Sequence, residues 1–397
     1  MDILLEQSER LVNSTQLDFK RYLFNTIKWN NRLIGIKGAR GTGKTTLLLQ
    51  YLKELHVPAN KAVYFSLDDL YFTFHTLKDT INHFYKNGGE VIVLDEVHKY
   101  KNWSLEIKNI YDFFPTIKII FTGSSIIDIT TQAGDLSRRA LMYELTGLSF
   151  REYLWAKNIV KINPLSLNDL LHHPQDLLKS IPNDFRPLAH FVEYLKVGFY
   201  PFGLDDFSSV HQRINQLIRT IVEIDMAELQ DFDIRNAKKL LQLIYVIAQQ
   251  VPFKPNISNL AEKTGIHRNS LNNYFHYLEQ AKIISLLFPA GISTIVLQKP
   301  EKIFLNNSTL LYALTEDNVE IGNARETFFL SQLVPFYTVQ MPKQGDFIIN
   351  DKYTFEVGGK GKSVKQIKHL EDAWIVKDDI EMPMLKAIPL WMFGLLY

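Results

Sequence analysis

The sequence predicts an α/β fold whose N-terminal part is built on a parallel sheet, and two observations support this prediction. Between residue 33 and about residue 145, short runs that are apolar throughout alternate with stretches of helical periodicity. Strands that are apolar on both faces are typical of a parallel sheet covered by helices on both sides. In addition, the glycine-rich turn GARGTGKT, residues 38–45, closely follows the first apolar run. A turn of this kind is expected at the carboxyl edge of such a sheet.

The expected strands occur in order along this part of the chain. They are LIGIK at 33–37, AVYFSL at 62–67, VIVLDE at 91–96, IKIIFTG at 117–123 and, less clearly, LMYELT at 141–146. Helical periodicity predominates from about residue 148 to 250, and the prolines of Gln249–Asn256 predict a joint there because they disfavour a continuous helix. The expected domains are a core at 1–147, a helical segment at 148–250, a helix-turn-helix unit at 251–310 and an α/β unit at 311–397.

Composition narrows the classes of function. The 44 lysine and arginine residues are balanced by 43 aspartate and glutamate residues, so any nucleic-acid binding must come from a local patch. With no cysteine among its 397 residues, the chain has no disulfide, thiolate metal site or cysteine nucleophile. The N-terminus does not resemble a signal peptide, and no stretch reaches the ~18 apolar residues needed to span a bilayer. We expect a soluble cytoplasmic protein with no membrane association.

The turn at 38–45 matches the phosphate-binding pattern G-x-x-x-x-G-K-[ST], with a strand before it and a helical stretch after it. Glycines allow successive backbone N–H groups to point inward, and the start of a helix adds partial positive charge. Lys44 is expected to reach the terminal phosphates, and Thr45 to coordinate Mg²⁺. The alternative is a glycine turn that matches by chance. The residues expected to bind the nucleotide are Gly38, Ala39, Arg40, Gly41, Thr42, Gly43, Lys44, Thr45 and Thr46.

A pair of carboxylates at the end of the third expected strand makes the nucleotide hypothesis more specific. Asp95 is expected to hold Mg²⁺ through water, and Glu96 to polarise the water that attacks the γ-phosphate. Two carboxylates at a strand end are otherwise common in a solvated turn. Because both motifs occur in the order that a nucleotide hydrolase requires, hydrolysis with Mg²⁺ is the stronger hypothesis. His98, two residues further on, is interpreted as a surface histidine in preference to a residue that supports the site.

Polar residues after the fourth expected strand are candidates for sensing the nucleotide. Of Ser124 and Ser125, we favour Ser124 as the hydrogen-bond partner of the γ-phosphate or of the attacking water. A helix N-cap explains a serine here equally well. Arg138 and Arg139 are candidates for neutralising charge in the transition state, within this subunit or in a neighbouring one. An ordinary salt bridge is at least as good an interpretation of either arginine.

Several longer segments resemble one family, the bacterial and archaeal AAA+-type ATPases whose C-terminal domain has winged-helix and PD-(D/E)xK nuclease-like parts. The resemblance rests on GARGTGKTTLL, YFSLDDL, VIVLDEVHKYKNWSLEIKNIYD, FTGSS, LSRRALMYELTGLSFREYL, GNARETFFLSQL and GDFIINDKYTFEVGGKGKS. It implies the P-loop NTPase fold, with a five-stranded core of the additional-strand, catalytic-glutamate class and with Asp68 and Asp69 at the end of the second strand. It also implies ATP as the nucleotide, a helical lid, a winged helix and a restriction-endonuclease-like α/β domain.

Residues 258–284, SNLAEKTGIHRNSLNNYFHYLEQAKII, form a helix-turn-helix pattern with its turn at Gly265. In the second helix, apolar residues repeat at helical spacing and predict one buried face, which consists of Leu271, Tyr274, Phe275 and Leu278. The outward polar residues suit the major groove of DNA, with residues 283–307 as a wing. Packing or protein docking is an equal alternative, because the patch carries little positive charge. The candidate DNA contacts are Lys263, Arg268, Asn269, Asn272 and Asn273.

Glu326, Asp346, Glu356 and Lys360 follow in the order helix, strand, strand, which resembles the core of PD-(D/E)xK nucleases. Such enzymes need two carboxylates that converge on Mg²⁺ and a lysine that stabilises charge on the phosphate. Here the E-x-K spacing is broken, because Lys360 comes two residues late and strand alternation no longer brings it to the same place. Lys360 or Lys362 could return from the glycine-rich turn. We favour a degenerate site that serves folding or nucleic-acid docking over an active nuclease.

These observations leave several functions open. The leading hypothesis is Mg²⁺-dependent ATP binding and hydrolysis that drives a conformational switch of the C-terminal modules, with DNA as a candidate partner. The second is ATP-regulated DNA binding with little hydrolysis, and the third is an ATP-gated, Mg²⁺-dependent nuclease. A pure interaction scaffold is least favoured, because it leaves the nucleotide motifs without a use. The sequence identifies neither a protein partner nor an oligomeric state.

Overall fold

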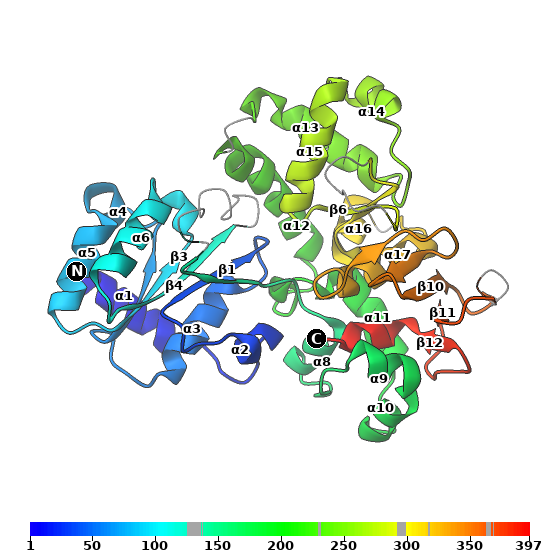
Figure 1. Ribbon diagram of the computed structural model, residues 1–397, viewed down its shortest axis with the longest axis horizontal. Helices are drawn as coiled ribbons and strands as arrows, with labels where there is room; N and C mark the ends of the chain where they lie inside the picture. Colours follow the sequence, from blue (N-terminus) through cyan, green and yellow to red (C-terminus); the bar gives the residue numbers. More distant parts are fainter. Residues whose placement is uncertain are drawn as a thin grey trace. The chain divides into compact units, whose positions relative to one another are not determined.

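The computed structural model divides the chain into two compact units, Met1–Gly147 (unit 1) and Leu148–Tyr397 (unit 2) (Figure 1). It describes residues 1–124, 136, 138–228, 232–291, 299–316, 318–362, 367 and 369–397. Each unit contains its own sheet and its own buried apolar residues. The further divisions expected at residues 250 and 310 stay predictions. Within the described residues, no helix combines the length and the apolar character needed to cross a membrane.

Unit 1 is built on a sheet in which every strand runs parallel to its neighbours. Its strands are β1 (Leu33–Gly38), β2 (Ala62–Ser66), β3 (Val91–Asp95), β4 (Lys118–Ser124) and β5 (Leu141–Glu144), in the spatial order β2-β3-β4-β1-β5. The predicted α/β fold is therefore confirmed, including its less clear fifth strand. β4 lies between the strand that precedes the glycine-rich turn and the strand that ends in Asp95. This inserted strand is the one that the resemblance to the additional-strand class implied.

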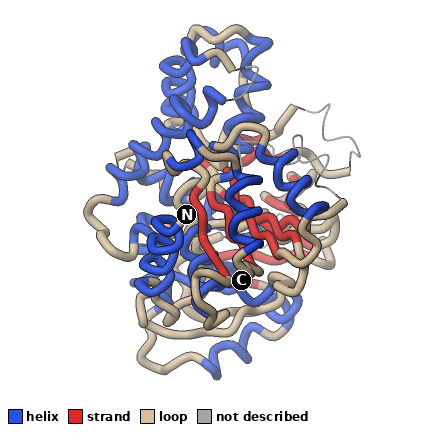
Figure 2. Tube along the Cα trace, turned by 90° about the vertical axis from the view of Figure 1, so that its left-hand side faces the viewer, coloured by secondary structure: helices blue, strands red, loops and turns tan. Residues whose placement is uncertain are grey.

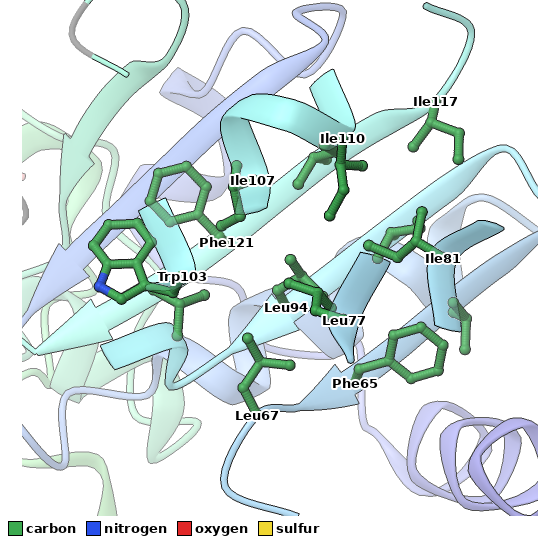
Figure 3. Packing of buried hydrophobic residues seen from close by; sticks show 14 of the residues in the cluster. Phe65, Leu67, Leu77, Ile81, Leu94, Trp103, Ile107, Ile110, Ile117 and Phe121 are labelled. Carbon is green, nitrogen blue, oxygen red and sulfur yellow. The ribbon is translucent and has the colours of Figure 1, made fainter. Parts of the chain in front are cut away.

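The strands are apolar throughout because helices cover both faces of this sheet. On one face, Phe65, Leu94 and Phe121 pack against α5 (Leu77–Lys86) and α6 (Trp103–Phe113), as Figure 3 shows. Alternate strand residues belong to a second cluster with α2 (Tyr22–Thr26) and α3 (Lys44–Glu54); they are Ile34, Ile36, Tyr64, Val93 and Ile120. The other helical segments of unit 1 are α1 (Asp2–Ser14), α4 (Tyr71–Phe74) and the 3₁₀ turn η1 (Val97–Lys99). Because both faces are buried, the register is fixed and the carboxyl ends of β1, β3 and β4 are held together.

Helices predominate in unit 2 up to residue 280, as the periodicity predicts, and the last three of them form the blue group at the top of Figure 2. The α-helices are α8 (Phe150–Ala156), α9 (Leu167–His172), α10 (Pro174–Ser180), α11 (Pro187–Glu193), α12 (Val210–Thr220), α13 (Ala237–Ala248), α14 (Ile257–Thr264) and α15 (Arg268–Gln280). π-helical turns, η3 (Tyr194–Gly198) and η5 (Ile221–Asp225), follow α11 and α12. The expected joint at 249–256 lies between α13 and α14.

After α15, β6 (Ile284–Leu287) and β7 (Lys302–Leu305) form an antiparallel pair where a wing was expected. The segment 292–298 between them lies outside the described residues. Two helices and a second sheet follow; they are α16 (Ser308–Leu314), α17 (Ile321–Leu333), β8 (Val339–Gln340), β9 (Phe347–Ile349), β10 (Tyr353–Gly358), β11 (Ala373–Lys377) and β12 (Ala387–Pro389), with the 3₁₀ segment η10 (Leu390–Leu395) at the end. β10 runs parallel to β11 and antiparallel to β9, so this sheet is mixed. Phe329 of α17 packs on Phe347 and Phe355, which places α17 against this sheet.

Candidate functional site

The phosphate-binding pattern forms a tight loop between β1 and α3. Gly41 and Gly43 have φ angles of 81° and 89°, a left-handed conformation that favours glycine. A Cβ atom on Gly38 would lie 2.4 Å from the carbonyl oxygen of Leu145, so only glycine fits there. Gly43 is the N-cap of α3, and the unsatisfied N–H groups of that helix therefore begin at the loop. This backbone geometry and the positive helix end are suited to an anion.

Lys44 is a cation held against this loop. It is only 6% exposed, and its Nζ donates hydrogen bonds to the carbonyl oxygens of Gly38 and Ala39, at 3.0 and 3.1 Å. Of the other residues expected in the nucleotide site, Thr42 is buried and donates to the same Ala39 carbonyl at 2.9 Å, whereas Thr46 is exposed. A buried ammonium group beside a helix N-terminus favours a negatively charged ligand.

Asp95 is buried at the end of β3 and accepts hydrogen bonds from hydroxyl groups of three other elements. Thr45 Oγ1 donates to Asp95 Oδ2 at 2.6 Å, and the Tyr64 hydroxyl donates to the same atom at 2.9 Å. Thr122 Oγ1 donates to Asp95 Oδ1. The backbone N–H of Glu96 donates to the same atom at a distance of 3.1 Å. Burial, and next the charge of Asp95, raises the pKa of Tyr64, so this hydroxyl keeps its proton and stays a donor. No sequence pattern pointed to Tyr64, which is one more apolar residue of a buried strand.

Thr45 and Asp95 form a donor set that fits Mg²⁺. Their side-chain oxygens are 2.6 Å apart, and hydroxyl and carboxylate oxygens are hard ligands of the kind this ion prefers. In the part of the chain that the structure describes, no three His, Cys, Asp or Glu side chains are grouped to hold a metal ion. Mg²⁺ needs no such group, because it usually takes one or two protein ligands and completes its shell with water and phosphate oxygens. The pair is therefore suited to Mg²⁺ that arrives with a nucleotide.

Glu96 follows Asp95 directly, and a buried histidine contacts its carboxylate. His98 Nε2 lies 3.2 Å from Glu96 Oε2; the Glu96 side chain is 26% exposed and that of His98 is 0% exposed. The prediction of a surface histidine at position 98 is wrong. After β3, Glu96 adopts a left-handed conformation with φ 51°, and the turn η1 places the His98 ring against the end of β4. A lone histidine carries no pattern from which this contact could be read.

Ser124 ends β4 and pairs in register with Gly38, the first residue of the phosphate-binding pattern. It is buried, and its backbone N–H donates to His98 Nδ1 at 3.4 Å. The structure therefore brings together the loop, the carboxylate pair and Ser124 at adjacent strand ends, as the sequence suggested. A hydrogen bond from Ser124 to the γ-phosphate stays a prediction, and Ser125 lies outside the described residues.

The two candidate arginines differ in their surroundings. Arg139 Nε and one of its terminal nitrogens each donate to a carboxylate oxygen of Asp112 at 3.1 Å, which is the ordinary salt bridge offered as one interpretation. Arg138 is exposed. Of the two, Arg138 therefore has the side chain more available to a ligand or a neighbouring subunit, and that role stays a prediction.

A buried arginine that the sequence did not single out connects the loop to the end of unit 1. Arg21 is 4% exposed and donates to the carbonyl oxygens of Thr42 at 2.6 Å, and of Thr146 and Gly147 at 2.8 Å each. Thr42 belongs to the phosphate-binding pattern, and Gly147 is the last residue of unit 1. Since three carbonyl groups share one guanidinium, a shift of the loop is expected to alter the hydrogen bonds of Thr146 and Gly147.

The predicted faces of the helix-turn-helix are confirmed in unit 2. The apolar residues Leu271, Tyr274, Phe275 and Leu278 are buried. The polar residues are exposed; they are Lys263, Arg268, Asn269, Asn272, Asn273 and His276. Only two of these are permanently cationic, so contact with DNA stays a prediction.

In the predicted second site, the structure pairs Glu356 with Lys362, one of the two lysines that the sequence left open. Lys362 Nζ lies 2.6 Å from Glu356 Oε1, whereas Lys360 is exposed, so Lys362, the second of the two lysines that the sequence offered, takes the place expected for Lys360. The turn after β10 explains this, because the Lys362 N–H bonds to the Gly359 carbonyl and the chain reverses. Gly358 makes room: a Cβ atom there would lie 2.6 Å from Lys362 Cδ.

The charges within this second group are partly compensated. Burial, opposed by Lys302 and reinforced by Asp346, raises the pKa of Glu326. Lys302 Nζ lies 3.3 Å from Glu326 Oε2. Burial alone would lower the pKa of Lys362, but its hydrogen bond to Glu356 and the charges of Asp346 and Glu356 raise it. The cluster is thus held together by ion pairs.

Comparison with known proteins matches parts of both units. A family described as "AAA domain" matches residues 30–154, and a family described as "Domain of unknown function (DUF8612)" matches residues 188–320. The chain is 30% identical over 380 residues to the uncharacterized protein MJ1637 of Methanocaldococcus jannaschii, and this match covers 87% of the chain and 79% of that protein.

Among solved structures, AMPPCP-bound DnaA from Aquifex aeolicus is 15% identical with a TM-score of 0.31, covering 68% of this chain and 91% of that one. The Hsp104–ADP complex of S. cerevisiae is 16% identical with a TM-score of 0.32, covering 70% of this chain and 40% of that one. At TM-scores this low, neither similarity bears on what this chain binds.

Proposed function

This chain belongs to the same family as MJ1637 and carries an AAA domain at residues 30–154, and from this premise we infer that unit 1 binds ATP with Mg²⁺ and hydrolyses it. The observation that carries the proposal is the 2.6 Å contact between Thr45 and Asp95, which joins the phosphate-binding loop to the acidic strand end. Either motif alone has an ordinary structural explanation, a glycine turn that matches by chance or a solvated turn at a strand end. Their direct contact brings the carboxylate at the end of β3 to the loop that carries the hydroxyl of Thr45 and the buried ammonium group of Lys44.

Each residue has a defined part in this proposal. The loop N–H groups and Lys44 bind the phosphates, and Thr45 and Asp95 hold Mg²⁺. When bound, the ion supplies positive charge that offsets the charge developing on the phosphoryl oxygens. Glu96 accepts a hydrogen bond from the attacking water and polarises it for in-line displacement at the γ-phosphate. Ser124, the register partner of Gly38, donates a hydrogen bond to the γ-phosphate or to that water; its place at the strand end beside the loop supports this role.

The proposal is tested by ATP binding and turnover in purified protein with and without Mg²⁺. Lys44→Ala should weaken ATP binding by about 100-fold, because hydrogen bonds to a charged group contribute ~1.5–3 kcal/mol each. Lys86→Ala is the matched control, since Lys86 is an exposed lysine of the same unit. Equal ATP affinity for the wild type and Lys44→Ala would overturn the site, and ATP binding without phosphate release would overturn the hydrolysis.

We propose further that nucleotide binding changes the conformation of the chain where unit 1 ends. The support is Arg21, whose guanidinium bonds to the Thr42 carbonyl in the loop and to the Thr146 and Gly147 carbonyls. Adding ATP should then change amide hydrogen exchange at residues 144–149. Arg21→Lys should bind ATP but lose this response, because an ammonium group cannot reach all three carbonyls in one fork.

Arg32→Lys is the matched control for this experiment. Arg32 also donates to three carbonyl groups, those of Tyr111, Phe114 and Ile117, which lie outside the loop. If Arg21→Lys keeps the ATP-dependent change in exchange, the coupling through Arg21 is wrong.

A second candidate function is DNA binding by unit 2. The supporting observation is the clean separation of faces on α15, with Arg268, Asn269 and Asn272 exposed. Phosphate contacts dominate such binding, so Lys263→Ala with Arg268→Ala should weaken it at every DNA sequence and reduce its salt dependence. Equal affinity of the wild type and the double variant across salt concentrations would exclude this surface.

A further inference from the structure

The buried ring of His98 joins the proposed base to the strand that carries Ser124. Its Nε2 lies 3.2 Å from Glu96 Oε2, and its Nδ1 accepts a hydrogen bond from the Ser124 backbone N–H at 3.4 Å. Both contacts are made by a side chain with 0% exposure, so water does not compete for the ring. The motifs that define the nucleotide site leave this histidine without a role.

The two contacts together select one form of the ring. A backbone N–H can only donate, so the Nδ1 atom that faces Ser124 must carry no hydrogen. In a neutral imidazole, the single hydrogen then sits on Nε2, the ring nitrogen that lies 3.2 Å from Glu96 Oε2. The backbone of β4 therefore selects the tautomer whose N–H is on the side of the ring that contacts Glu96. This arrangement is the usual means by which a second group fixes the direction of a histidine N–H.

We propose that His98 is a positioning residue that holds the Glu96 carboxylate in the orientation needed to polarise the attacking water. This proposal rests on the proposed ATP hydrolysis. Glu96 needs such support for two reasons. Its side chain is partly exposed, and its own backbone is left-handed, so the residue is not held by the hydrogen bonds of a strand. Without the Nε2–H donor, the carboxylate can take other rotamers, and small displacements of a reacting group lower the rate of a positioned reaction.

The contact between His98 and Ser124 should make the position of Glu96 depend on whether a nucleotide is bound. Ser124 is the register partner of Gly38, so a shift of the loop on phosphate binding moves the same backbone that bonds to Nδ1. His98 thereby connects the phosphate loop, the end of β4 and the proposed base through atoms in direct contact.

Substitutions of His98 can separate the two contacts of its ring. Glutamine places an amide N–H near the Nε2 position and keeps the donor to Glu96, whereas asparagine places a polar atom near Nδ1 and does not reach Glu96. His98→Ala and His98→Asn should each lower kcat for ATP by about 10- to 100-fold, as loss of a supporting partner does at other sites, with KM almost unchanged. His98→Gln should recover most of this loss.

Glu96→Gln is the reference variant, because it removes the base itself and should lower kcat at least as far as His98→Ala. In a Glu96→Gln background, His98→Ala should have no further effect on kcat, since the two residues act as one unit. An unchanged or increased kcat in His98→Ala, or equal activity of the glutamine and asparagine variants, would overturn the role of His98. Unfolding by denaturant checks that each variant is folded.

A spectroscopic measurement decides the contact independently of turnover. The ¹⁵N chemical shifts of the His98 ring in the wild type should be those of the neutral Nε2–H tautomer, and Glu96→Gln should shift the Nε2 signal. An Nδ1–H tautomer would overturn the proposal even in an active enzyme. Wild-type protein with the expected ring signals but no ATP hydrolysis would instead overturn the proposed function and leave the contact between the two side chains standing.

Discussion

The two groups of carboxylates in this chain are held in opposite ways. In unit 1, Asp95 accepts hydrogen bonds from the hydroxyls of Thr45, Tyr64 and Thr122 and from a backbone N–H, which are all neutral donors. In unit 2, Glu356 and Glu326 are paired with the ammonium groups of Lys362 and Lys302. Neutral donors fix a carboxylate without cancelling its charge, whereas an ion pair cancels it. The carboxylate of Asp95 therefore keeps a full negative charge that can attract Mg²⁺. The charges of Glu356 and Glu326 are already compensated by the protein's own lysines.

This difference separates a site suited to a metal from one suited to holding a domain together. A lysine beside two carboxylates is also what the PD-(D/E)xK pattern requires, and Lys362 restores it despite the broken spacing. A degenerate site and a nuclease would both contain these contacts of unit 2. Matched substitutions in the two groups can distinguish them.

The largest expected effect comes from removing one charge in unit 1. Asp95→Asn keeps the shape of the side chain but lowers its attraction for Mg²⁺, so kcat/KM for Mg²⁺–ATP should fall at least about 100-fold, since a bound metal contributes several kcal/mol. The corresponding substitution in unit 2, Glu356→Gln, should leave ATP turnover unchanged. Phosphate release measured over a range of Mg²⁺ concentrations compares the two variants.

The same pair of variants tests the nuclease interpretation. If unit 2 is a Mg²⁺-dependent nuclease, wild-type protein cleaves DNA or RNA and Glu356→Gln does not. If the group is degenerate, as we favour, neither protein cuts. Loss of ATP turnover in Glu356→Gln would contradict the separation of the two groups.

A smaller effect is expected from the lysines of unit 2, which the sequence could not tell apart. Lys362→Met leaves the carboxylate of Glu356, a side chain with 2% exposure, without its ammonium partner. The folded state should lose about 2 kcal/mol, less than the ~3–5 kcal/mol of a fully buried pair, because Lys362 is 32% exposed and water screens it. Lys360→Met is the control and should change stability by less than ~0.5 kcal/mol, as at other exposed positions.

Urea unfolding monitored by circular dichroism measures both variants. Adding Glu356→Gln to Lys362→Met should recover part of the loss, because no buried charge is then left unpaired. If Lys360→Met is the more damaging change, the placement of Lys362 over β10 is wrong.

The parts of the site that the sequence predicted are those encoded locally. The glycines of the loop, Lys44 and the pair Asp95–Glu96 lie within short patterns whose spacing reflects one turn or one strand end. The burial of Leu271 and the exposure of Arg268 followed from helical period alone.

The residues that the sequence missed act through contacts between distant segments. Tyr64 lies 31 residues from Asp95, and Arg21 lies 125 residues from Thr146. Each looks ordinary in its own segment, Tyr64 in an apolar strand and Arg21 before a short helix. The choice between Lys360 and Lys362 stayed open for a related reason, because strand alternation does not predict where the turn after Gly358 brings the chain back. The packing of distant segments decides which polar groups support a site. No local pattern in a single sequence predicts those contacts.

The smallest expected effect concerns the pH dependence of the second group. The pKa of Glu326 is raised, chiefly by burial, above the value of about 4.3 of an unfolded chain. A raised carboxyl pKa means that the folded state binds the proton more tightly, so the contribution of Glu326 to stability is present at low pH and is lost as pH rises through the folded-state pKa. Glu326→Gln resembles the protonated form at every pH. Wild-type stability relative to this variant should therefore increase as the pH falls from 7 toward 4, by less than about 1 kcal/mol for a partly exposed pair with Lys302.

Glu320→Gln, at an exposed residue just before α17, is the control, and urea unfolding at both pH values measures all three proteins. A stability difference between the wild type and Glu326→Gln that does not vary with pH would show that Lys302 and Lys362 fully offset the cost of burying this charge, and the contrast between the two carboxylate groups would then extend to their titration.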